Sequence, residues 1–331
     1  QNTKQTEQNS IDIRLRMERR EWRVFHRDRP VGYSFPISAD LEKKNAERGN
    51  MYYNIEKMDG YFRIGSPENV FCYLIEGTDK AMLIDTGFGY GNLREAVRSV
   101  TDKPLVIINT HGHCDHVGGN GQFEESCFIH EQDLALCYEH SNREIRAGNV
   151  EQAKHSLNYE TGEMFDALPE DFEMETYLNR SCGNLQTIKE GDLFELGKAS
   201  MEILETPGHT RGGISVLYRE KNLLFIGDAA GFFVWLFAKE TTSRETYIHT
   251  LEKMYALQAD GYIGAHNPEI MHKEDFQLYI RAASEADYEK GEPFESFFAQ
   301  ETKPKVCALD GMTLKDMFRP GFAAVVISAE K

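Results

Sequence analysis

Four side chains that can bind a metal ion lie within six residues of this chain. The stretch directly follows the apolar run 105–108 and holds three histidines and an aspartate: His111, His113, Asp115 and His116. Neutral imidazole and carboxylate are the ligands preferred by Zn²⁺, Fe²⁺ and Mn²⁺. A polar turn would account for any one of these histidines. Together, without a cation, they would repel one another as imidazolium ions. The stretch therefore predicts a metal site at the end of a buried strand.

Three further residues of ligand type follow strand-like apolar runs later in the chain. His209 comes after the run 201–204, Asp228 after 223–226, and His266 after 262–263. Strands that end in glycine-containing loops can bring polar side chains together without burying unpaired backbone. Four strand ends thus each deliver candidate metal ligands.

The order of these motifs resembles the metallo-β-lactamase superfamily, in its glyoxalase II-like hydrolase branch. The matching segments are HxHxDH at 111–116, TPGHT at 206–210, GD at 227–228 and GAH at 264–266, together with DTG at 85–87. The resemblance covers about 61–289. It implies an α/β (α+β) fold, a four-layer αββα sandwich.

The resemblance also implies a binuclear centre of two divalent metal ions, Zn²⁺ in the first place, with Fe or Mn as alternatives. The implied ligands are His111, His113 and His209 for one ion, Asp115, His116 and His266 for the other, and Asp228 for both. Asp85 would orient a ligand histidine. The true β-lactamase branch lacks the bridging aspartate, so Asp228 points away from antibiotic hydrolysis.

The implied chemistry is hydrolysis of an ester-like bond by a hydroxide that bridges the two metals. Asp115 and Asp228 would be catalytic, orienting the hydroxide and taking part in proton transfer. The substrate would be a thioester, a lactone or a carboxylic ester. Two alternatives stay open: a phosphodiesterase that acts on a small molecule, and a persulfide dioxygenase-like oxidoreductase with a single iron.

The apolar runs divide the chain into a catalytic domain with two extensions. We expect an N-terminal extension at 1–50 with an edge strand at 11–17, a metallo-β-lactamase-fold domain at 51–290, and a C-terminal extension at 291–331. A helical insertion at about 131–184 would form either a lid or a surface elaboration. The expected strands are 70–75, 81–84, 105–108, 127–129, 201–204, 214–218 and 223–226, and the expected helices are 93–100, 132–140, 244–257 and 273–289.

Charge and composition limit the partners. The net charge is −17, and because residues 1–50 carry +3, the remaining residues carry −20. Such an acidic body disfavours nucleic acid, so we expect a small-molecule substrate. No run approaches the roughly 18 apolar residues of a membrane span. The six scattered cysteines show no CxxC pair and are expected to be reduced, which favours the cytoplasm. The chain starts at Gln1, so a cleaved signal peptide stays open, as does a homodimer.

Other polar and aromatic candidates receive simpler interpretations. We expect Cys114 to pack beneath the site rather than bind metal, and His130 to make a structural hydrogen bond. The histidines expected to be solvated are His26, His140, His155, His249 and His272. His155 and Tyr159 are candidates for substrate contact. An aromatic group either lines an apolar pocket near the metals or packs in the core: Phe232, Phe233, Trp235 and Phe237.

Overall fold

A computed structural model describes residues 52–157, 163–295, 302–317 and 319–330 of the chain. They belong to two compact units, one of residues 52–150 with 168–330, and a small one within 151–167. In the small unit, strands β7 (Ser156–Leu157) and β8 (Met164–Phe165) pair antiparallel. The expected strand at 11–17 lies outside the described residues.

Alternating apolar side chains give the first sheet of the large unit two buried faces. On β4 (Ala81–Ile84), Ala81 and Leu83 join one buried cluster, and Met82 and Ile84 join another, as the two-residue period of a strand requires. The strand order is β1-β2-β3-β4-β5-β6-β9, antiparallel as far as β4 and parallel beyond it. The other bounds are β1 (Asn54–Lys57), β2 (Phe62–Gly65), β3 (Phe71–Glu76), β5 (Leu105–Ile108), β6 (Ser126–His130) and β9 (Asn184–Ile188).

A second sheet packs its inner face against the first. Phe225 and Ile263 of the second sheet share one buried cluster with Met82 and Ile84 of the first, so a single apolar core fills the space between them. The strand order is β10-β11-β12-β13-β15, and β13 and β15 are parallel to each other. The bounds are β10 (Leu193–Glu195), β11 (Ser200–Glu205), β12 (Ile214–Tyr218), β13 (Leu223–Gly227) and β15 (Gly261–Gly264).

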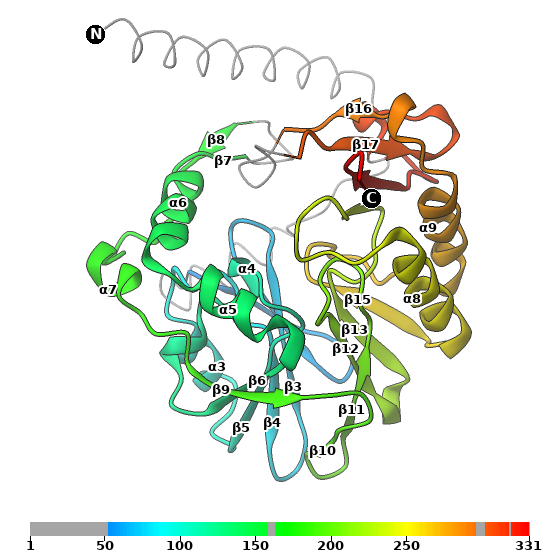
Figure 1. Ribbon diagram of the computed structural model, residues 1–331. Coiled ribbons are helices and arrows are strands. Elements are labelled where there is room, and N and C mark those ends of the chain that lie inside the picture. Colours follow the sequence, from blue (N-terminus) through cyan, green and yellow to red (C-terminus); the bar gives the residue numbers. More distant parts are fainter. Residues whose placement is uncertain (1–51, 158–162, 296–301, 318, 331) are drawn as a thin grey trace, which may run out of the picture. The chain divides into compact units, whose positions relative to one another are not determined.

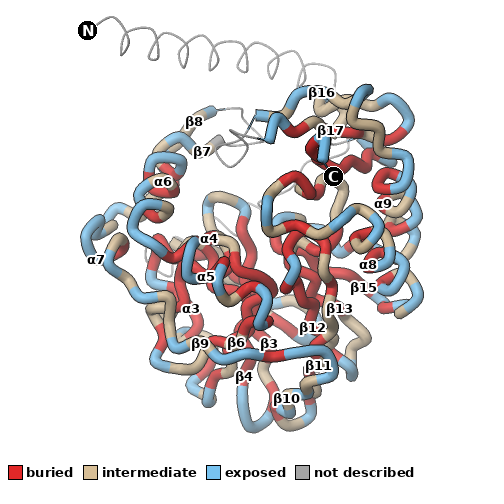
Figure 2. The backbone as a smooth tube through the Cα atoms, viewed as in Figure 1, coloured by how far each residue is buried: buried red, intermediate tan, exposed pale blue. Residues whose placement is uncertain are grey.

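Helices cover the outer faces of both sheets (Figure 1). Leu93 and Val97 of α3 (Leu93–Arg98) pack on the first sheet. Leu251 of α8 (Arg244–Leu257) and Phe276 of α9 (Lys273–Glu285) pack on the second, around Leu224. The central strands of both sheets, such as β3, β4 and β13, are largely buried in Figure 2. The predicted αββα sandwich is confirmed.

Residues near the C-terminus complete a third, smaller sheet. Its strand order is β14-β18-β17-β16, with β14 and β18 parallel. Val325 packs on the core beneath α8 and α9, whereas the neighbouring Val326 faces a separate cluster that includes Phe237. The bounds are β14 (Phe233–Trp235), β16 (Glu292–Pro293), β17 (Lys305–Ala308) and β18 (Ala324–Ile327). The third sheet thus ties the C-terminal residues to the segment that follows Asp228.

Several elements differ from the sequence expectations. The strands at 81–84, 105–108 and 214–218 and the helix at 244–257 have the expected bounds. The helix expected at 273–289 ends at Glu285, because Ala286 leaves the helical conformation (ψ 124°), and the helix expected at 93–100 ends at Arg98. The stretch 131–184 holds the pair β7–β8 besides helices. The other α-helices among the described residues are α4 (Cys114–Val117), α5 (Leu134–His140), α6 (Arg143–Ala153) and α7 (Met174–Leu178).

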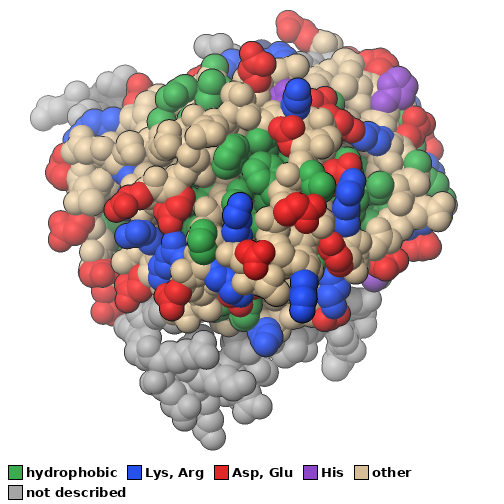
Figure 3. Space-filling view, turned by 90° about the horizontal axis from the view of Figure 1, so that it is seen from below, with side chains coloured by type: hydrophobic (Ala, Val, Ile, Leu, Met, Phe, Trp, Pro, Cys, Tyr) green, Lys and Arg blue, Asp and Glu red, His purple; other side chains and the backbone are tan. Residues whose placement is uncertain are grey.

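The described surface shows mixed charge on the face seen in Figure 3. Lys and Arg side chains there are interspersed with Asp and Glu rather than gathered into a stripe. None of the described helices combines the length and the hydropathy of a membrane-crossing segment.

Candidate metal centre

The seven predicted ligand residues meet at one edge of the two sheets. Four strands deliver them: β5 leads to the loop and short helix with the first four residues, β11 leads to His209, β13 to Asp228 and β15 to His266. Strands β11, β13 and β15 run in the same direction, so their carboxyl ends share one edge. The structure therefore brings together side chains that lie up to 155 positions apart in the chain.

Two glycines let the ligand loops approach their neighbours closely. Gly227 has a positive φ of 51°, and a Cβ there would lie 2.4 Å from Thr110 Oγ1. The register of β13 against β15 also shifts between Phe225 and Gly227, and such bulges re-aim the following side chain, here Asp228. A Cβ on Gly112 would lie 2.9 Å from the carbonyl oxygen of Asp133. Both sites need a residue without a side chain.

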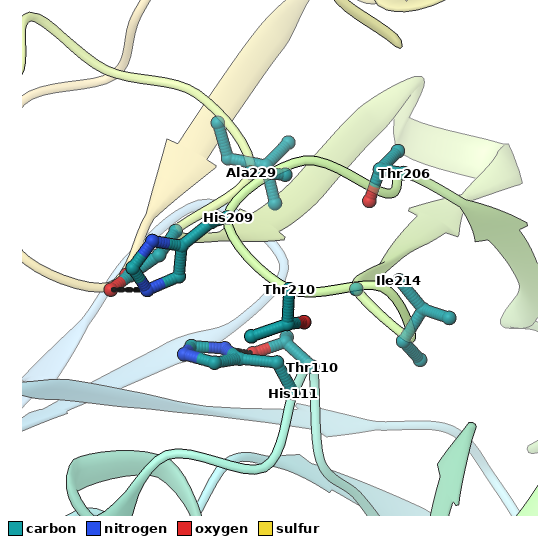
Figure 4. A pocket seen from close by; sticks show the side chains of 10 residues that line it. Thr110, His111, Thr206, His209, Thr210, Ile214 and Ala229 are labelled. Atoms are coloured by element: carbon teal, nitrogen blue, oxygen red, sulfur yellow. Dashed lines mark hydrogen bonds and ion pairs between the residues drawn. The ribbon is translucent and has the colours of Figure 1, made fainter. Parts of the chain in front are cut away.

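The first ligand group consists of three histidines: His111, His113 and His209. The Nδ1 atom of His113 lies 3.0 Å from His111 Nε2 and 2.9 Å from His209 Nε2. Figure 4 shows the rings of His111 and His209 turned toward the same space. A cavity of about 10 Å³ lies beside them and is lined by Thr110, Thr210 and Asp228 among others. Its volume is close to the minimum that holds one water molecule.

The second group combines histidines with carboxylates: Asp115, His116, Asp228 and His266. His266 Nε2 lies 3.2 Å from Asp115 Oδ2 and 3.3 Å from Asp228 Oδ2. The His116 side chain is fully buried, whereas that of His266 is 43% exposed. The second group therefore joins a fully buried ligand to a solvent-exposed one.

Asp228 lies between the two groups. Its Oδ2 atom is 3.7 Å from His209 Nε2 in the first group and 3.5 Å from His116 Nε2 in the second. A single carboxylate thus faces ring nitrogens of both groups, as expected of a bridging ligand.

Three of the ligand rings, those of His113, His116 and His209, are held from behind at the nitrogen that faces away from the centre. Asp85 Oδ2 lies 2.8 Å from His116 Nδ1, in the position that the resemblance implied. His209 Nδ1 lies 3.0 Å from the carbonyl oxygen of Trp235, and His113 Nε2 lies 3.1 Å from Glu240 Oε1. Such partners fix the tautomer and direction of a ligand histidine.

Two acidic residues at the site were not found by sequence reasoning. One is Glu240. The other is the buried Asp133, whose carboxylate accepts hydrogen bonds from the backbone of Gly112 at 3.0 Å and of Gly212 at 2.7 Å, so it joins the loops that carry the first group. Neither acid lies in one of the ligand motifs, and only the fold brings them to the centre.

Two histidines of the first group, His111 and His209, are held neutral. Burial, together with the neighbouring His116 and His113, keeps the pKa of His111 well below its usual range. Burial and the nearby His113 also lower the pKa of His209. A neutral imidazole is the form that binds a metal ion.

The second group is held charged in the absence of a metal. Burial opposes the charge on Asp228, but His266 and His116 outweigh it and hold its pKa well below the usual range. Desolvation of the ring within the cluster likewise opposes the charge on the partly exposed His266, yet Asp228 and Asp115 raise its pKa to about 10. A cation would take the place of these protons, because histidine must lose its proton to bind metal.

A buried, unpaired atom of His116 is a further indication that these residues fit a metal ion. Its Nε2 atom is buried and has no hydrogen-bond partner among the described atoms. The nearest carboxylate oxygens, of Asp115 and Asp228, lie at 3.5 Å, beyond a normal hydrogen bond. An unpaired buried polar atom costs about 1–3 kcal/mol, and a cation at this point would satisfy it.

The remaining candidates are placed as follows. Cys114 is buried and lies outside both ligand groups, with Sγ 3.6 Å from Asn149 Oδ1. All six cysteines are free. His130 makes the expected structural contact, 3.1 Å from Glu205. His155 is exposed, and Tyr159 and His26 lie outside the described residues.

The expectation that His140 is solvated is wrong. Its ring is buried and stacks on that of His113, with centroids 5.0 Å apart, and its Nδ1 accepts a hydrogen bond from the backbone N–H of Cys114. Burial and His113 lower its pKa to about 4. It lies at the C-terminal end of α5, which packs near α4, and its charged sequence neighbours did not reveal this.

The aromatic residues after Asp228 pack together rather than line a described cavity. Phe237 is buried, and Phe233 and Trp235 are half-buried against Phe294, with ring centroids 5.7 and 5.4 Å away.

Comparison with known proteins decides the family. A sequence profile described as the metallo-beta-lactamase superfamily matches residues 65–132 and 144–266, more than half of the chain and all seven ligand residues. The chain belongs to the metallo-beta-lactamase superfamily. Its C-terminal sheet strands β16 to β18 lie beyond the matched residues.

Two curated relatives of this superfamily member are hydrolases. The human (Homo sapiens) acyl-coenzyme A thioesterase MBLAC2 is 24% identical over 218 residues, which cover 61% of this chain and 72% of the relative. The hydroxyacylglutathione hydrolase of Brucella ovis is 30% identical over 209 residues, which cover 62% of this chain and 65% of the relative, just under two thirds of its length. Both matches agree with the glyoxalase II-like resemblance.

Among solved structures, the sec-alkylsulfatase Pisa1 from Pseudomonas sp. has a TM-score of 0.52 at 14% identity. The match covers 69% of this chain and 40% of that one. At this identity it supports the shared fold alone.

Proposed function

We propose that this superfamily member binds two divalent metal ions and hydrolyses an ester-like bond, in the first place a thioester. The observation that carries the proposal is the position of Asp228, whose Oδ2 faces His209 in one ligand group and His116 and His266 in the other at 3.3–3.7 Å. A carboxylate shared by two adjacent ligand groups suits two ions better than one.

The proposed ligands follow the two groups. One ion would be held by His111, His113 and His209, the other by Asp115, His116 and His266, with Asp228 common to both. Seven ligand side chains for two ions leave coordination positions free, as a catalytic site requires. Zn²⁺ is the first choice, and Fe or Mn suits the same donors.

The bound ions would lower the pKa of a shared water toward about 7 and polarise the carbonyl of the substrate. The chain itself supplies orientation. Asp115 and Asp228 are both held ionised, so their oxygens can accept hydrogen bonds from a water molecule and fix its direction. With side chains 20% exposed, they lie at the open side of the centre.

The chemistry of the leaving group favours a thioester over an alkyl ester. As proposed metal ligands, Asp115 and Asp228 would be ionised and would have no proton to give to a leaving group. A thiol has a pKa of about 8.5, so a thiolate can depart at neutral pH without prior protonation, whereas an alcohol leaving group needs a proton. The acyl-coenzyme A thioesterase among the relatives supports the same choice.

The test is metal analysis combined with a matched substrate panel. We expect about two ions per chain in protein purified without added metal, and faster turnover of an acyl thioester than of the alkyl ester with the same acyl group. A lactone, a phosphodiester and a persulfide with oxygen uptake complete the panel. One iron per chain with oxygen uptake would contradict the proposal in favour of the dioxygenase, and phosphodiester cleavage alone would contradict it in favour of a phosphodiesterase.

A further inference from the structure

One segment of the chain supplies the rear partners of two of the three histidines in the first ligand group. Residues 235–240 join β14 to the loop before α8. The carbonyl oxygen of Trp235 lies 3.0 Å from His209 Nδ1, and Glu240 Oε1 lies 3.1 Å from His113 Nε2. We call residues 235–240 the outer brace.

We propose that Glu240 is a positioning residue that directs His113 toward the metal. Its carboxylate accepts a hydrogen bond from the Nε2–H of His113. The lone pair is then on Nδ1, the atom that lies 2.9 Å from His209 Nε2 and 3.0 Å from His111 Nε2. An imidazole with the proton on the wrong nitrogen cannot bind metal through Nδ1. The inference rests on the proposed metal centre.

The Glu240 side chain is held where this role requires. It is 16% exposed, and that of His113 is 13% exposed, so water competes little for the hydrogen bond. The backbone carbonyl of Glu240 accepts a hydrogen bond from Arg211 N at 3.0 Å, and Arg211 lies in the loop that carries His209. On the other side, Lys239 pairs with Glu139 of α5 at 2.7 Å.

The His113 ring is fixed on its face as well as at its edge. His140 stacks on it at 5.0 Å with the planes 29° apart, and the backbone N–H of Cys114 donates to His140 Nδ1. Stacking on one face does not choose between the two ring nitrogens. Glu240 makes that choice, because it meets Nε2 alone.

The outer brace is in turn anchored to the C-terminal strand. Strand β14 pairs with β18, where Trp235 lies opposite Val326, and Leu236 N donates to Val326 O at 2.8 Å. Strand β18 lies beyond the residues that match the superfamily. The first ligand group thus depends on a part of the chain outside the matched core.

Zn²⁺ titration of the full-length protein, stripped of metal by a chelator and read by competition with a chromophoric chelator, tests this role. Wild-type protein should show two binding steps. Glu240→Ala should weaken one of them by about 10–100-fold and leave the other within a few-fold. Glu240→Gln should restore most of the loss, because the amide oxygen still accepts the Nε2 proton.

The chain offers a matched control in the pair His130–Glu205, which has the same Nε2–Oε1 distance of 3.1 Å but no role at the centre. Glu205→Ala should leave both binding steps unchanged. The inference would be overturned if Glu240→Ala bound zinc in two steps with the wild-type affinities. It would also be overturned if Glu240→Gln lost as much zinc affinity as Glu240→Ala. Fewer than two steps in the wild type would instead contradict the metal centre itself.

A folding defect can be recognised separately. The metal-free variants should unfold at the same temperature as metal-free wild type. If Glu240→Ala does not fold, Glu240→Asp decides the matter, because its shorter side chain falls short of His113. If one zinc-binding step of that variant is weaker than in wild type, the inference is supported. If both steps keep the wild-type affinities, it is overturned.

Discussion

The two ligand groups are supported from behind by different parts of the molecule. In the second group, His116 is held by Asp85, which follows β4 of the first sheet. In the first group, His113 and His209 are held by the outer brace, which is continuous with the third sheet. One support belongs to the sandwich, and the other depends on the C-terminal strand.

This difference implies that the groups respond separately to mutation. A change at the end of β4 should act on the second group, and a change in the third sheet should act on the first. Asp228, which faces both groups, should affect them together.

The largest effect is expected for Asp228→Asn. An amide nearly preserves the shape, so the protein should fold, but it supplies neither the charge nor two equivalent oxygens to a pair of cations. Turnover should fall by about a hundredfold or more, several kcal/mol of lost stabilisation, and both zinc-binding steps should weaken. The measurements are kcat on the active substrate and zinc titration.

Asp260→Asn, at an exposed aspartate just before β15, is the matched control and should behave as wild type. If Asp228→Asn weakened a single binding step and kept wild-type turnover, Asp228 would belong to one group only, and the two-ion mechanism would be wrong.

The next effect separates the groups. His266→Ala removes a ligand from the second group alone, so the bound metal should drop from about two ions to about one per chain, with activity largely lost. Elemental analysis of the purified variant measures this. His249→Ala, at an exposed position on α8, is the control. Unchanged stoichiometry in His266→Ala would refute its assignment as a ligand.

A smaller effect is expected for Asp85→Asn, the counterpart of Glu240→Ala. Asp85 is buried and also accepts hydrogen bonds from Thr110 N at 2.7 Å and Thr110 Oγ1 at 2.8 Å. An amide can satisfy only part of this set. The zinc-binding step of the second group should weaken by about 10–100-fold, and unfolding should become easier by about 1–3 kcal/mol.

The step weakened in Asp85→Asn should not be the step weakened in Glu240→Ala, and the double variant should lose both. If the two single changes weakened the same step, the separate supports described above would not exist.

The sequence was informative wherever a motif coincided with a strand end. The seven ligand residues and Asp85 follow apolar runs whose strands have nearly the expected bounds. The sandwich follows from the same runs, because alternating residues such as Met82 and Leu83 must face different cores.

The outer brace could not be predicted in this way. Trp235 acts through its backbone carbonyl, which every residue has, and Glu240 is one acid among many in a chain of net charge −17. Their positions depend on the pairing of β14 with β18, two short strands about 90 residues apart. Asp133 and His140 were missed for the same reason, since only the packing of α5 against the ligand loops brings them there.

The smallest effect concerns this pairing of β14 with β18. Val325 lies on β18 and is buried in the core beneath α8 and α9, in the same cluster as Leu236 of the outer brace. Val325→Ala should destabilise the protein by about 1–3 kcal/mol through lost burial and the cavity it leaves. Because β18 also carries the hydrogen bond from Leu236 N to Val326 O, the first ligand group should lose zinc affinity by less than about tenfold. This is a smaller loss than that expected when a direct hydrogen-bond partner is removed.

Val97→Ala on α3 removes an equally buried valine from the helix that covers the first sheet and should cost similar stability with no change in either zinc-binding step. Thermal unfolding and zinc titration of both variants test this prediction. If Val325→Ala and Val97→Ala had the same zinc affinities, the C-terminal strand would stabilise the fold without supporting the first ligand group.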